Sequence, residues 1–328
     1  MISKSELQQI KSIITSNKKF ILTTHVNPDG DGIGSEIALA TYLRHLGKEV
    51  MIYNHSETPG NYEFLDPLGD IQLYKPEQHE QSVRESDAIF ILDISDWKRL
   101  RDLGELLRNL EVPKICIDHH PLNQSFVDLD VIYPPASSTG ELIYEVLIHL
   151  GANLRGKIAE ALYTALLTDT GSFRYSNTTP EAHRVVADLL AAGVNPNQVY
   201  QNVYENQPPN KMRLLAYILN NLKFEKDGRL VWFVITQDTL KTTNTQPYDT
   251  EGFADFPRTI SGVEICLMFL ETKEAKTKIS FRSKGRVVIN GLANQFGGGG
   301  HQFAAGAMVD GALKDVVPQV IEEAKALF

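Results

Sequence analysis

The sequence has 328 residues, more than one hydrophobic core usually serves, so we expect two domains. Its 42% hydrophobic and 22% charged residues are typical of a globular protein and exclude the disordered and fibrous classes. A formal net charge of −9 argues against a protein that coats long duplex nucleic acid, because such binding needs many Lys and Arg contacts to phosphate. No apolar run approaches the length of a membrane helix and no basic-apolar leader is present, so we expect a cytoplasmic protein without a membrane partner.

The first strong indication of function is a strand that ends in a cluster of ionisable residues. Residues 20–23 are typical of a strand and residues 33–46 of a helix, and the proline and alternating glycines between them predict a turn. His25, Asp29 and Asp31 are therefore crowded into one strand-to-helix connection. Carboxylates so close raise each other's pKa unless a cation lies between them. An isolated turn of this composition is an acidic surface turn about as often as it is a functional site, so its interpretation depends on the rest of the chain.

Further ionisable residues follow later elements in the same way. Asp93 ends one apolar strand, and Asp118, His119 and His120 end the next. Asp169 follows an alanine- and leucine-rich helix. In open α/β sheets, ligands bind outside the carboxyl ends of the parallel strands. We therefore expect these side chains to converge with those of the first turn.

The predicted secondary structure changes after the proline-rich turn at 206–210, beyond which strands predominate. We expect strands at 222–226, 230–236, 263–271 and 277–282 and a final helix at 314–327. The predicted organisation is a first domain of residues 1–190, a helical linker of residues 191–212, and a second domain of residues 213–328.

The ionisable residues of the first domain form an oxygen-rich set with two imidazoles. Such a set suits Mn²⁺, Mg²⁺, Fe²⁺ or Co²⁺, and six ligands suit two ions. Two-metal sites stabilise the attacking and leaving oxygens of an in-line displacement on phosphorus. Asp93 is the candidate for a bridging ligand, and His120 either donates to a phosphoryl oxygen or leaving group or is a buried structural histidine. The predicted metal ligands are His25, Asp29, Asp31, Asp93, His119 and Asp169.

The second domain carries a glycine run that can bring backbone N–H groups close to an anion. The predicted substrate-binding residues are Gly298, Gly299, Gly300, His301 and Arg282. The alternatives are a flexible hairpin or a helix-stop loop for the glycine run and an exposed edge-strand charge for the arginine.

These motifs together resemble the DHH phosphoesterase superfamily. The resemblance rests on HVNPDGDGIGS at 25–35, on Asp93, on the Asp-His-His triplet at 118–120 and on Asp169. In the second domain, FRS at 281–283 and GGGGHQFAAG at 297–306 look like a DHHA1 domain. The motifs occur in the expected order along nearly the whole chain, which is most similar to the small bacterial nano-RNase (oligoribonuclease) and pAp phosphatase group.

The resemblance implies an α/β fold: an N-terminal parallel-sheet DHH domain and a smaller C-terminal α+β DHHA1 domain, with the active site in the cleft between them. It implies two divalent ions, expected to be Mn²⁺, on the six ligands named above, and a homodimer. Arg282 and His301 match positions that hold the substrate's terminal phosphate and nucleotide, although Arg286 is an alternative to Arg282 in a loosely aligned stretch. The predicted catalytic residues are Asp93, Asp118 and His120.

The implied activity is a metal-dependent hydrolase, an exoribonuclease acting on very short single-stranded oligonucleotides and releasing mononucleotides. A related expectation is a 3′(2′),5′-bisphosphate nucleotidase activity that converts pAp to AMP. The alternatives are an inorganic pyrophosphatase or exopolyphosphatase with the same metal set, and a non-catalytic cyclic dinucleotide-binding protein. A base-stacking surface at Phe296 or Phe303 would favour a nucleotide substrate over polyphosphate, which needs a basic channel.

Overall fold

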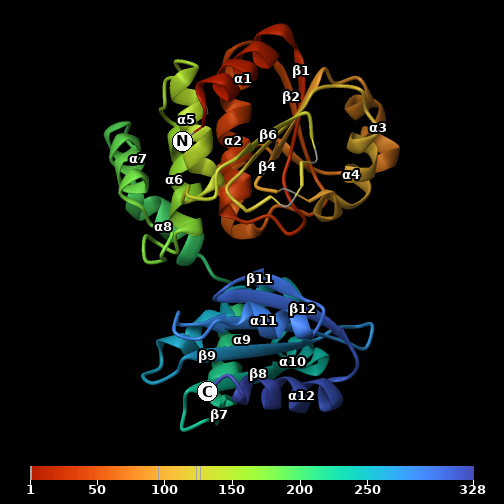
Figure 1. Ribbon diagram of the computed structural model, residues 1–328, viewed down its shortest axis with the longest axis vertical. Coiled ribbons are helices and arrows are strands. Elements are labelled where there is room, and N and C mark those ends of the chain that lie inside the picture. The colour runs from red at the N-terminus through yellow and green to blue at the C-terminus, as the bar shows by residue number, and fades with distance from the viewer. Residues whose placement is uncertain (1, 95, 123, 126) are drawn as a thin grey trace. The chain divides into compact units, whose positions relative to one another are not determined.

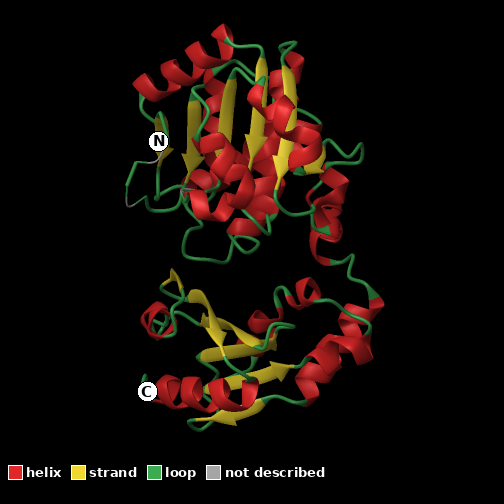
Figure 2. Ribbon diagram, turned by 90° about the vertical axis from the view of Figure 1, so that its right-hand side faces the viewer, coloured by secondary structure: helices red, strands yellow, loops and turns green. Residues whose placement is uncertain are grey.

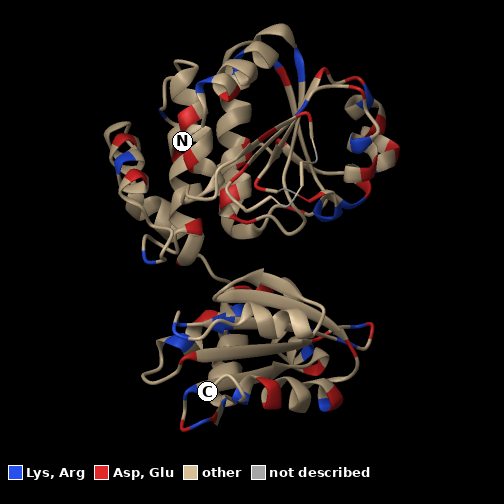
Figure 3. Cartoon of the chain, viewed as in Figure 1, with Lys and Arg blue, Asp and Glu red and all other residues tan. Residues whose placement is uncertain are grey.

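The computed structural model describes residues 2–94, 96–122, 124–125 and 127–328. They divide into two compact units, Met1–Asn206 and Gln207–Phe328. Helix α8 (Pro196–Tyr204), which lies inside the predicted linker, places Val199 and Val203 in the core of the first unit. Figure 3 shows Asp and Glu distributed over both units rather than gathered in one. Among the described residues, no helix combines the length and apolar character needed to cross a membrane.

The first unit is built on a six-stranded parallel sheet in the order β3-β2-β1-β4-β5-β6 (Figure 1). The α/β prediction is therefore confirmed. The strand order reverses between β1 and β4, and in such sheets the carboxyl edge at that point is the usual ligand site. The two outermost strands were not predicted, because they are short and their sequence lacks periodicity. The strands are β1 (Lys19–Thr23), β2 (Glu49–Asn54), β3 (Ile71–Leu73), β4 (Ala88–Leu92), β5 (Lys114–Asp118) and β6 (Leu129–Ile132).

Helices cover both faces of this sheet, and alternate side chains of each central strand enter different cores. In β1, Phe20 and Leu22 pack into the larger core beneath α1, α2, α5, α6 and α7, whereas Ile21 packs beneath α3 and α4 (Figure 1). The remaining helices are α1 (Lys4–Ser16), α2 (Gly30–His45), η1 (Gly60–Leu65), α3 (Pro76–Arg84), η2 (Trp97–Leu100), α4 (Arg101–Arg108), α5 (Thr139–His149), α6 (Lys157–Asp169) and α7 (Pro180–Ala191).

Helix α2 begins at Gly30, three residues earlier than predicted. Its alternating glycines are helical, and two of them, Gly30 and Gly34, allow a close approach to α6. A Cβ added at Gly34 would lie 2.4 Å from the carbonyl oxygen of Ala161, and one added at Gly30 would lie 2.5 Å from Thr168 Oγ1. The glycines thus set the helix spacing that brings the end of α6 beside the start of α2.

The second unit is a six-stranded sheet in the order β11-β12-β10-β9-β8-β7, antiparallel except for the β8–β9 pair. Helices cover both of its faces (Figure 2): α11 and α12 pack on one, and α9, α10 and η4 on the other. Its elements are α9 (Pro209–Asn220), β7 (Lys223–Glu225), β8 (Leu230–Ile235), α10 (Gln237–Thr243), η3 (Pro247–Thr250), η4 (Phe253–Thr259), β9 (Ile265–Glu271), β10 (Lys276–Ser283), α11 (Asn290–Gln295), β11 (Gly299–His301), β12 (Ala304–Asp310) and α12 (Leu313–Lys325).

We predict that Gly34→Ala lowers the melting temperature of the protein by roughly 2–10 °C. The added methyl group would press on a backbone oxygen, which costs about 1–3 kcal/mol in a well-packed interior. Gly60→Ala is the matched control, since a Cβ there meets no atom within 4 Å among the described residues. Thermal unfolding followed by circular dichroism compares the two variants, and equal melting temperatures would contradict the packing role of Gly34.

Candidate metal centre

The connection between β1 and α2 positions three of the predicted ligands. Asp29 is the N-cap of α2, and its Oδ1 accepts hydrogen bonds from the N–H groups of Asp31 at 3.0 Å and Gly32 at 3.2 Å. Its Oδ2 lies 4.0 Å from His25 Nε2. The His25 Nδ1 atom lies 2.9 Å from the carbonyl oxygen of Val26. The hydrogen is therefore assigned to Nδ1, which leaves Nε2 with the lone pair that a metal requires.

Asp93 follows β4, and its two carboxylate oxygens face different imidazoles. Oδ2 lies 3.4 Å from His25 Nε2, whereas Oδ1 lies 3.8 Å from His119 Nε2 and 3.5 Å from His120 Nδ1. Oδ1 also accepts a hydrogen bond from Thr139 Oγ1 at 3.1 Å. The backbone of Asp93 has φ +59°, a left-handed conformation that Asp tolerates better than most residues. Asp93 thus lies between two groups of donor atoms.

His119 is the centre of the second group. Its Nε2 lies 3.7 Å from Asp31 Oδ2 and 3.5 Å from Asp169 Oδ2. This nitrogen is buried and hydrogen-bonds to none of the described residues. Buried polar atoms are usually satisfied by a protein group, a water or an ion. Several carboxylate oxygens surround this unsatisfied nitrogen at distances longer than a hydrogen bond. Donor atoms that share a divalent cation have this arrangement.

The N-terminus of α5 holds Asp31. The N–H of Thr139 donates to Oδ2 at 2.7 Å and the N–H of Gly140 donates to Oδ1 at 2.8 Å. Helix N-terminal N–H groups favour the charged carboxylate. Burial and the neighbouring Asp169 act in the opposite direction and raise the pKa of Asp31 to about 8. The fold therefore both orients this carboxylate and leaves it short of positive charge.

The other ligands show the same shortage of positive charge. Burial raises the pKa of Asp169 to about 7, and burial with the surrounding carboxylates raises the pKa of Asp93 well above its ordinary value. Burial also lowers the pKa of His25, which favours the neutral imidazole that binds metals. Divalent cations would offset the repulsion and keep the carboxylates ionised. The donor set therefore fits divalent cations. Two of its groups are His25, Asp29 and Asp93, and Asp31, His119 and Asp169; a third group, Asp93, Asp118, His119 and His120, shares a residue with each.

Asp118 acts on His120. Its Oδ1 lies 2.8 Å from His120 Nδ1 and also accepts the backbone N–H of His120 at 2.9 Å. Burial acts to lower the pKa of His120, but this hydrogen bond and the charge of Asp118 outweigh it, so that the pKa lies above its ordinary value. Asp118 is itself buried, and its other oxygen hydrogen-bonds to none of the described residues.

Several residues that hold the ligands were missed by the sequence analysis. Besides Thr139 and Gly140, Asn177 donates from Nδ2 to the Asp169 carboxylate and carbonyl oxygens, each at 3.1 Å. One signal was available: Ser138 and Glu141 have the spacing of a helix capping box, and Ser138 Oγ does accept the N–H of Glu141. That pattern marks the start of α5, although it does not reveal what the helix end binds.

A buried polar network supports the strand end that carries His25. Asn54 Oδ1 accepts the N–H of Thr24 at 3.0 Å, and Asn54 Nδ2 donates to Glu36 Oε2 at 2.8 Å. All three side chains are fully buried. Burial raises the pKa of Glu36 to about 8. The network joins the ends of β1 and β2 to helix α2, directly beside the candidate ligand.

In the second unit, two of the predicted substrate residues share one row of the sheet. Ala304 of β12 pairs with Arg282 of β10 on one side and with His301 of β11 on the other. Directly opposite residues of antiparallel strands point to the same face, so the two side chains flank a small alanine. The arginine is partly engaged, because its Nε lies 3.7 Å from Asp255 Oδ1.

The glycine run leads from α11 into β11, which forms a hairpin with β12, and is therefore not a free loop. Gly299 and Gly300 belong to β11 and pair with β12. Gly300 has φ +140°, and a Cβ there would lie 2.6 Å from the carbonyl oxygen of Ala304, so no other residue fits without a shift. Gly298 precedes the strand, and the anion-binding role of the three glycines stays a prediction.

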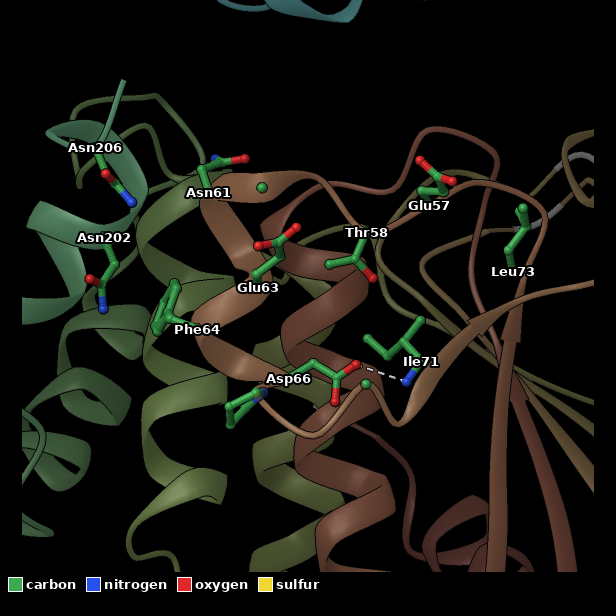
Figure 4. A pocket seen from close by; sticks show the side chains of 13 residues that line it. Glu57, Thr58, Asn61, Glu63, Phe64, Asp66, Ile71, Leu73, Asn202 and Asn206 are labelled. Carbon is green, nitrogen blue, oxygen red and sulfur yellow. Dashed lines mark hydrogen bonds between the residues drawn. The ribbon is translucent and has the colours of Figure 1, made fainter. Parts of the chain in front are cut away.

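A pocket of about 700 Å³ lies in the first unit (Figure 4). It opens beside η1, and its lining includes Glu57, Glu63, Phe64 and Asn202. None of the predicted metal ligands lines it. The candidate site therefore rests on the buried donor groups and not on this pocket.

Comparison with known proteins agrees with this geometry. Residues 19–167 match the family model of the DHH family N-terminal domain, and residues 234–328 match that of the DHHA1 domain. The bifunctional oligoribonuclease and PAP phosphatase NrnA of Thermus thermophilus is 33% identical over 92% of this chain and 88% of its own. The protein of the same name from Bacillus subtilis is 30% identical over 88% of each chain.

Solved structures give the same result. The crystal structure of an exopolyphosphatase-related protein from Bacteroides fragilis superposes with a TM-score of 0.93 at 30% identity, covering 99% of this chain and 96% of its own. The structure of exonuclease RecJ bound to manganese, at 15% identity and a TM-score of 0.51, covers 100% of this chain and 96% of its own and shares the fold alone. The chain belongs to the DHH family of phosphoesterases and carries a C-terminal DHHA1 domain.

Proposed function

We propose that this protein is a two-metal-dependent phosphodiesterase that hydrolyses very short oligonucleotides to mononucleotides and also converts pAp to AMP. The observation that carries the proposal is the position of Asp93, whose two oxygens face His25 on one side and His119 on the other. Relatives at 30–33% identity over most of their length are named bifunctional oligoribonuclease and PAP phosphatase.

The ligand roles follow from the two donor groups. His25 and Asp29 would hold one ion, Asp31, His119 and Asp169 the other, and Asp93 would bridge them. A pair of divalent cations, for which we propose Mn²⁺, supplies a nucleophile at neutral pH and stabilises charge on the phosphorus oxygens. Thr139 and Asn177 hold Asp93 and Asp169 in place, so less reorganisation is needed when the substrate reacts.

We propose that His120 donates a proton to the leaving group or a hydrogen bond to a phosphoryl oxygen. Asp118 binds its Nδ1 and its backbone N–H, which fixes the ring next to Asp93. Asp118 is therefore better described as a positioning residue than as a group that touches substrate, a refinement of the catalytic role expected from the sequence. The Asp118 carboxylate also stabilises a protonated His120.

For the substrate, we propose that Arg282 and His301 bind the terminal phosphate and nucleotide from one face of the second sheet. A short substrate is favoured because binding at a fixed terminal group gains little from a longer chain. We also propose that the protein is a cytoplasmic homodimer. Size-exclusion chromatography with light scattering tests the oligomeric state.

Polyphosphate hydrolysis is a weaker candidate because many basic side chains of the second unit are already paired with carboxylates or carbonyls. Arg286 lies 3.8 Å from Glu264, Lys276 lies 3.2 Å from Asp310, and Lys284 donates to the Ile260 carbonyl oxygen. A polyphosphate channel needs a row of cations free to meet successive phosphates.

Product analysis tests the proposed activity. We expect protein incubated with Mn²⁺ and an equimolar mixture of pApA, pAp and tripolyphosphate to release AMP from the first two while tripolyphosphate remains. Chelation with EDTA and the Asp93→Ala substitution should each abolish turnover, because both remove the bridged pair. Consumption of tripolyphosphate alone would contradict the proposal, as would normal turnover by the Asp93 variant.

We predict that Thr139→Val weakens Mn²⁺ binding by about 10-fold, a typical effect of removing a group that orients a metal ligand. Valine keeps the side-chain shape and loses the hydroxyl that donates to Asp93, while the backbone N–H to Asp31 remains. Thr139→Ser is the matched control because it retains the hydroxyl. Free Mn²⁺ is measured by electron paramagnetic resonance, and equal affinities of the Val and Ser variants would exclude this role.

Arg282→Ala should raise KM for pApA by about 10-fold or more, the usual effect of losing hydrogen bonds to a charged group. KM for unphosphorylated ApA should change little, because that substrate lacks the terminal phosphate. Lys273→Ala, at an exposed position of the same unit, is the control. Steady-state kinetics on both dinucleotides decides the matter: a similar KM increase for each would place Arg282 elsewhere in the mechanism.

A further inference from the structure

A group of tyrosines on the first unit has no role in the metal centre. The tyrosine cluster, as we name it, consists of Tyr175, Tyr200 and Tyr204 with the adjoining Arg174. The three tyrosines are 40%, 41% and 36% exposed, respectively. The ring centroids of Tyr200 and Tyr204 are 4.9 Å apart, and the guanidinium carbon of Arg174 lies 5.7 Å from the centroid of the Tyr175 ring.

The tyrosine cluster is attached to the loop that leaves the metal ligand Asp169. The N–H of Tyr175 donates to the carbonyl oxygen of Thr170 at 3.0 Å, so its backbone lies one hydrogen bond from the residue after Asp169. Asn177 then returns to bind the Asp169 carboxylate. The loop is thus closed at both ends on the ligand, which keeps Tyr175 near the metal centre.

Two further contacts give the cluster a fixed shape. The ring of Tyr175 lies against the backbone of Gly171, where an added Cβ would come within 2.4 Å of the ring. The side chains of Ser172 and Tyr204 interact, which links helix α8 to the same loop. Tyr200, one helical turn before Tyr204, extends the aromatic surface outward along α8.

This combination of groups suits an unpaired nucleobase. Exposed aromatic side chains accept a base by stacking, and an arginine beside them adds a cation for the ring or its phosphate. Exposed aromatic groups of this kind usually mark a binding surface. A position beside Asp169 makes the occupant a base of the molecule that reacts at the metal centre, rather than one from a distant strand.

We propose that the tyrosine cluster is a stacking site for one base of the short oligonucleotide whose phosphodiester is cleaved at the metal centre. The proposal rests on the proposed function and deepens it, because it makes one nucleoside position of the substrate depend on a base and not only on phosphate. Polyphosphate, which carries no base, would gain nothing from the cluster.

The test is the steady-state kinetics of Tyr200→Ala on pApA and on two analogues, each abasic at one of the two nucleotides. Tyr200 is chosen because it lies on α8, outside the 170–177 loop, whereas Tyr204 interacts with Ser172 of that loop. We expect KM for pApA to rise roughly 10-fold, the scale of one lost base stack, with kcat within about two-fold of wild type. For one analogue the variant and wild type should have the same KM, since the stacked base is already missing.

The controls separate stacking from an indirect effect. Tyr200→Phe should keep the wild-type KM because it retains the ring, and Tyr248→Ala removes a tyrosine that is 75% exposed in the second unit. An unchanged KM for pApA would overturn the proposal and favour a protein partner for the cluster. An equal KM increase for pApA and both abasic analogues would also overturn it. Failure of the wild-type protein to cleave pApA would instead overturn the proposed function, so the two results are distinguishable.

Discussion

The main physical constraint on the first unit is the mutual repulsion of carboxylates that are buried together. Asp31, Asp93 and Asp169 lie within reach of one imidazole, and burial raises the pKa of each. Several uncompensated charges in one interior site would cost several kcal/mol each. The arrangement becomes favourable when divalent cations occupy it, so metal affinity and fold stability are linked at this edge of the sheet.

The fold lowers the cost of that cluster before any ion binds. Two helices begin at the site, and both direct N–H groups at carboxylates: α2 is capped by Asp29 and α5 by contacts to Asp31. Both helix starts are closely packed: a Cβ added at Gly30 of α2 would lie 2.5 Å from Thr168 Oγ1, and one added at Gly140 of α5 would lie 2.4 Å from the Ala165 Cβ. The parallel sheet adds Asp93 at the point where its strand order reverses. The sequence motif and the sheet topology therefore both help to accommodate the buried carboxylates.

The sequence predicts which ionisable side chains gather at one site but not the residues that support them, for a physical reason. His25, Asp93 and His119 follow strongly apolar strands, and the carboxyl ends of parallel strands meet at one edge. Thr139 and Asn177 follow no such rule, because their contacts depend on where a distant helix and loop return to the sheet; the Thr139–Asp31 contact spans 108 residues. Local pattern also failed for β11, whose glycines are typical of loops and pair as a strand because the neighbouring β12 fits closely against them.

The buried network of Glu36, Asn54 and Thr24 supports the candidate metal centre through residues that are not themselves predicted ligands. A fully buried carboxyl group with a pKa near 8 is favoured in its neutral form at pH 7. In that form Glu36 still accepts the Asn54 amide, and Asn54 accepts the N–H of Thr24, the residue before His25. A buried polar chain is tolerated where its hydrogen bonds specify one geometry. Here that geometry is the end of β1, so neutral hydrogen bonds hold the strand end that carries the candidate ligand His25. Neutral groups also hold Asp31, Asp93 and Asp169: backbone N–H groups, a hydroxyl and an amide, respectively.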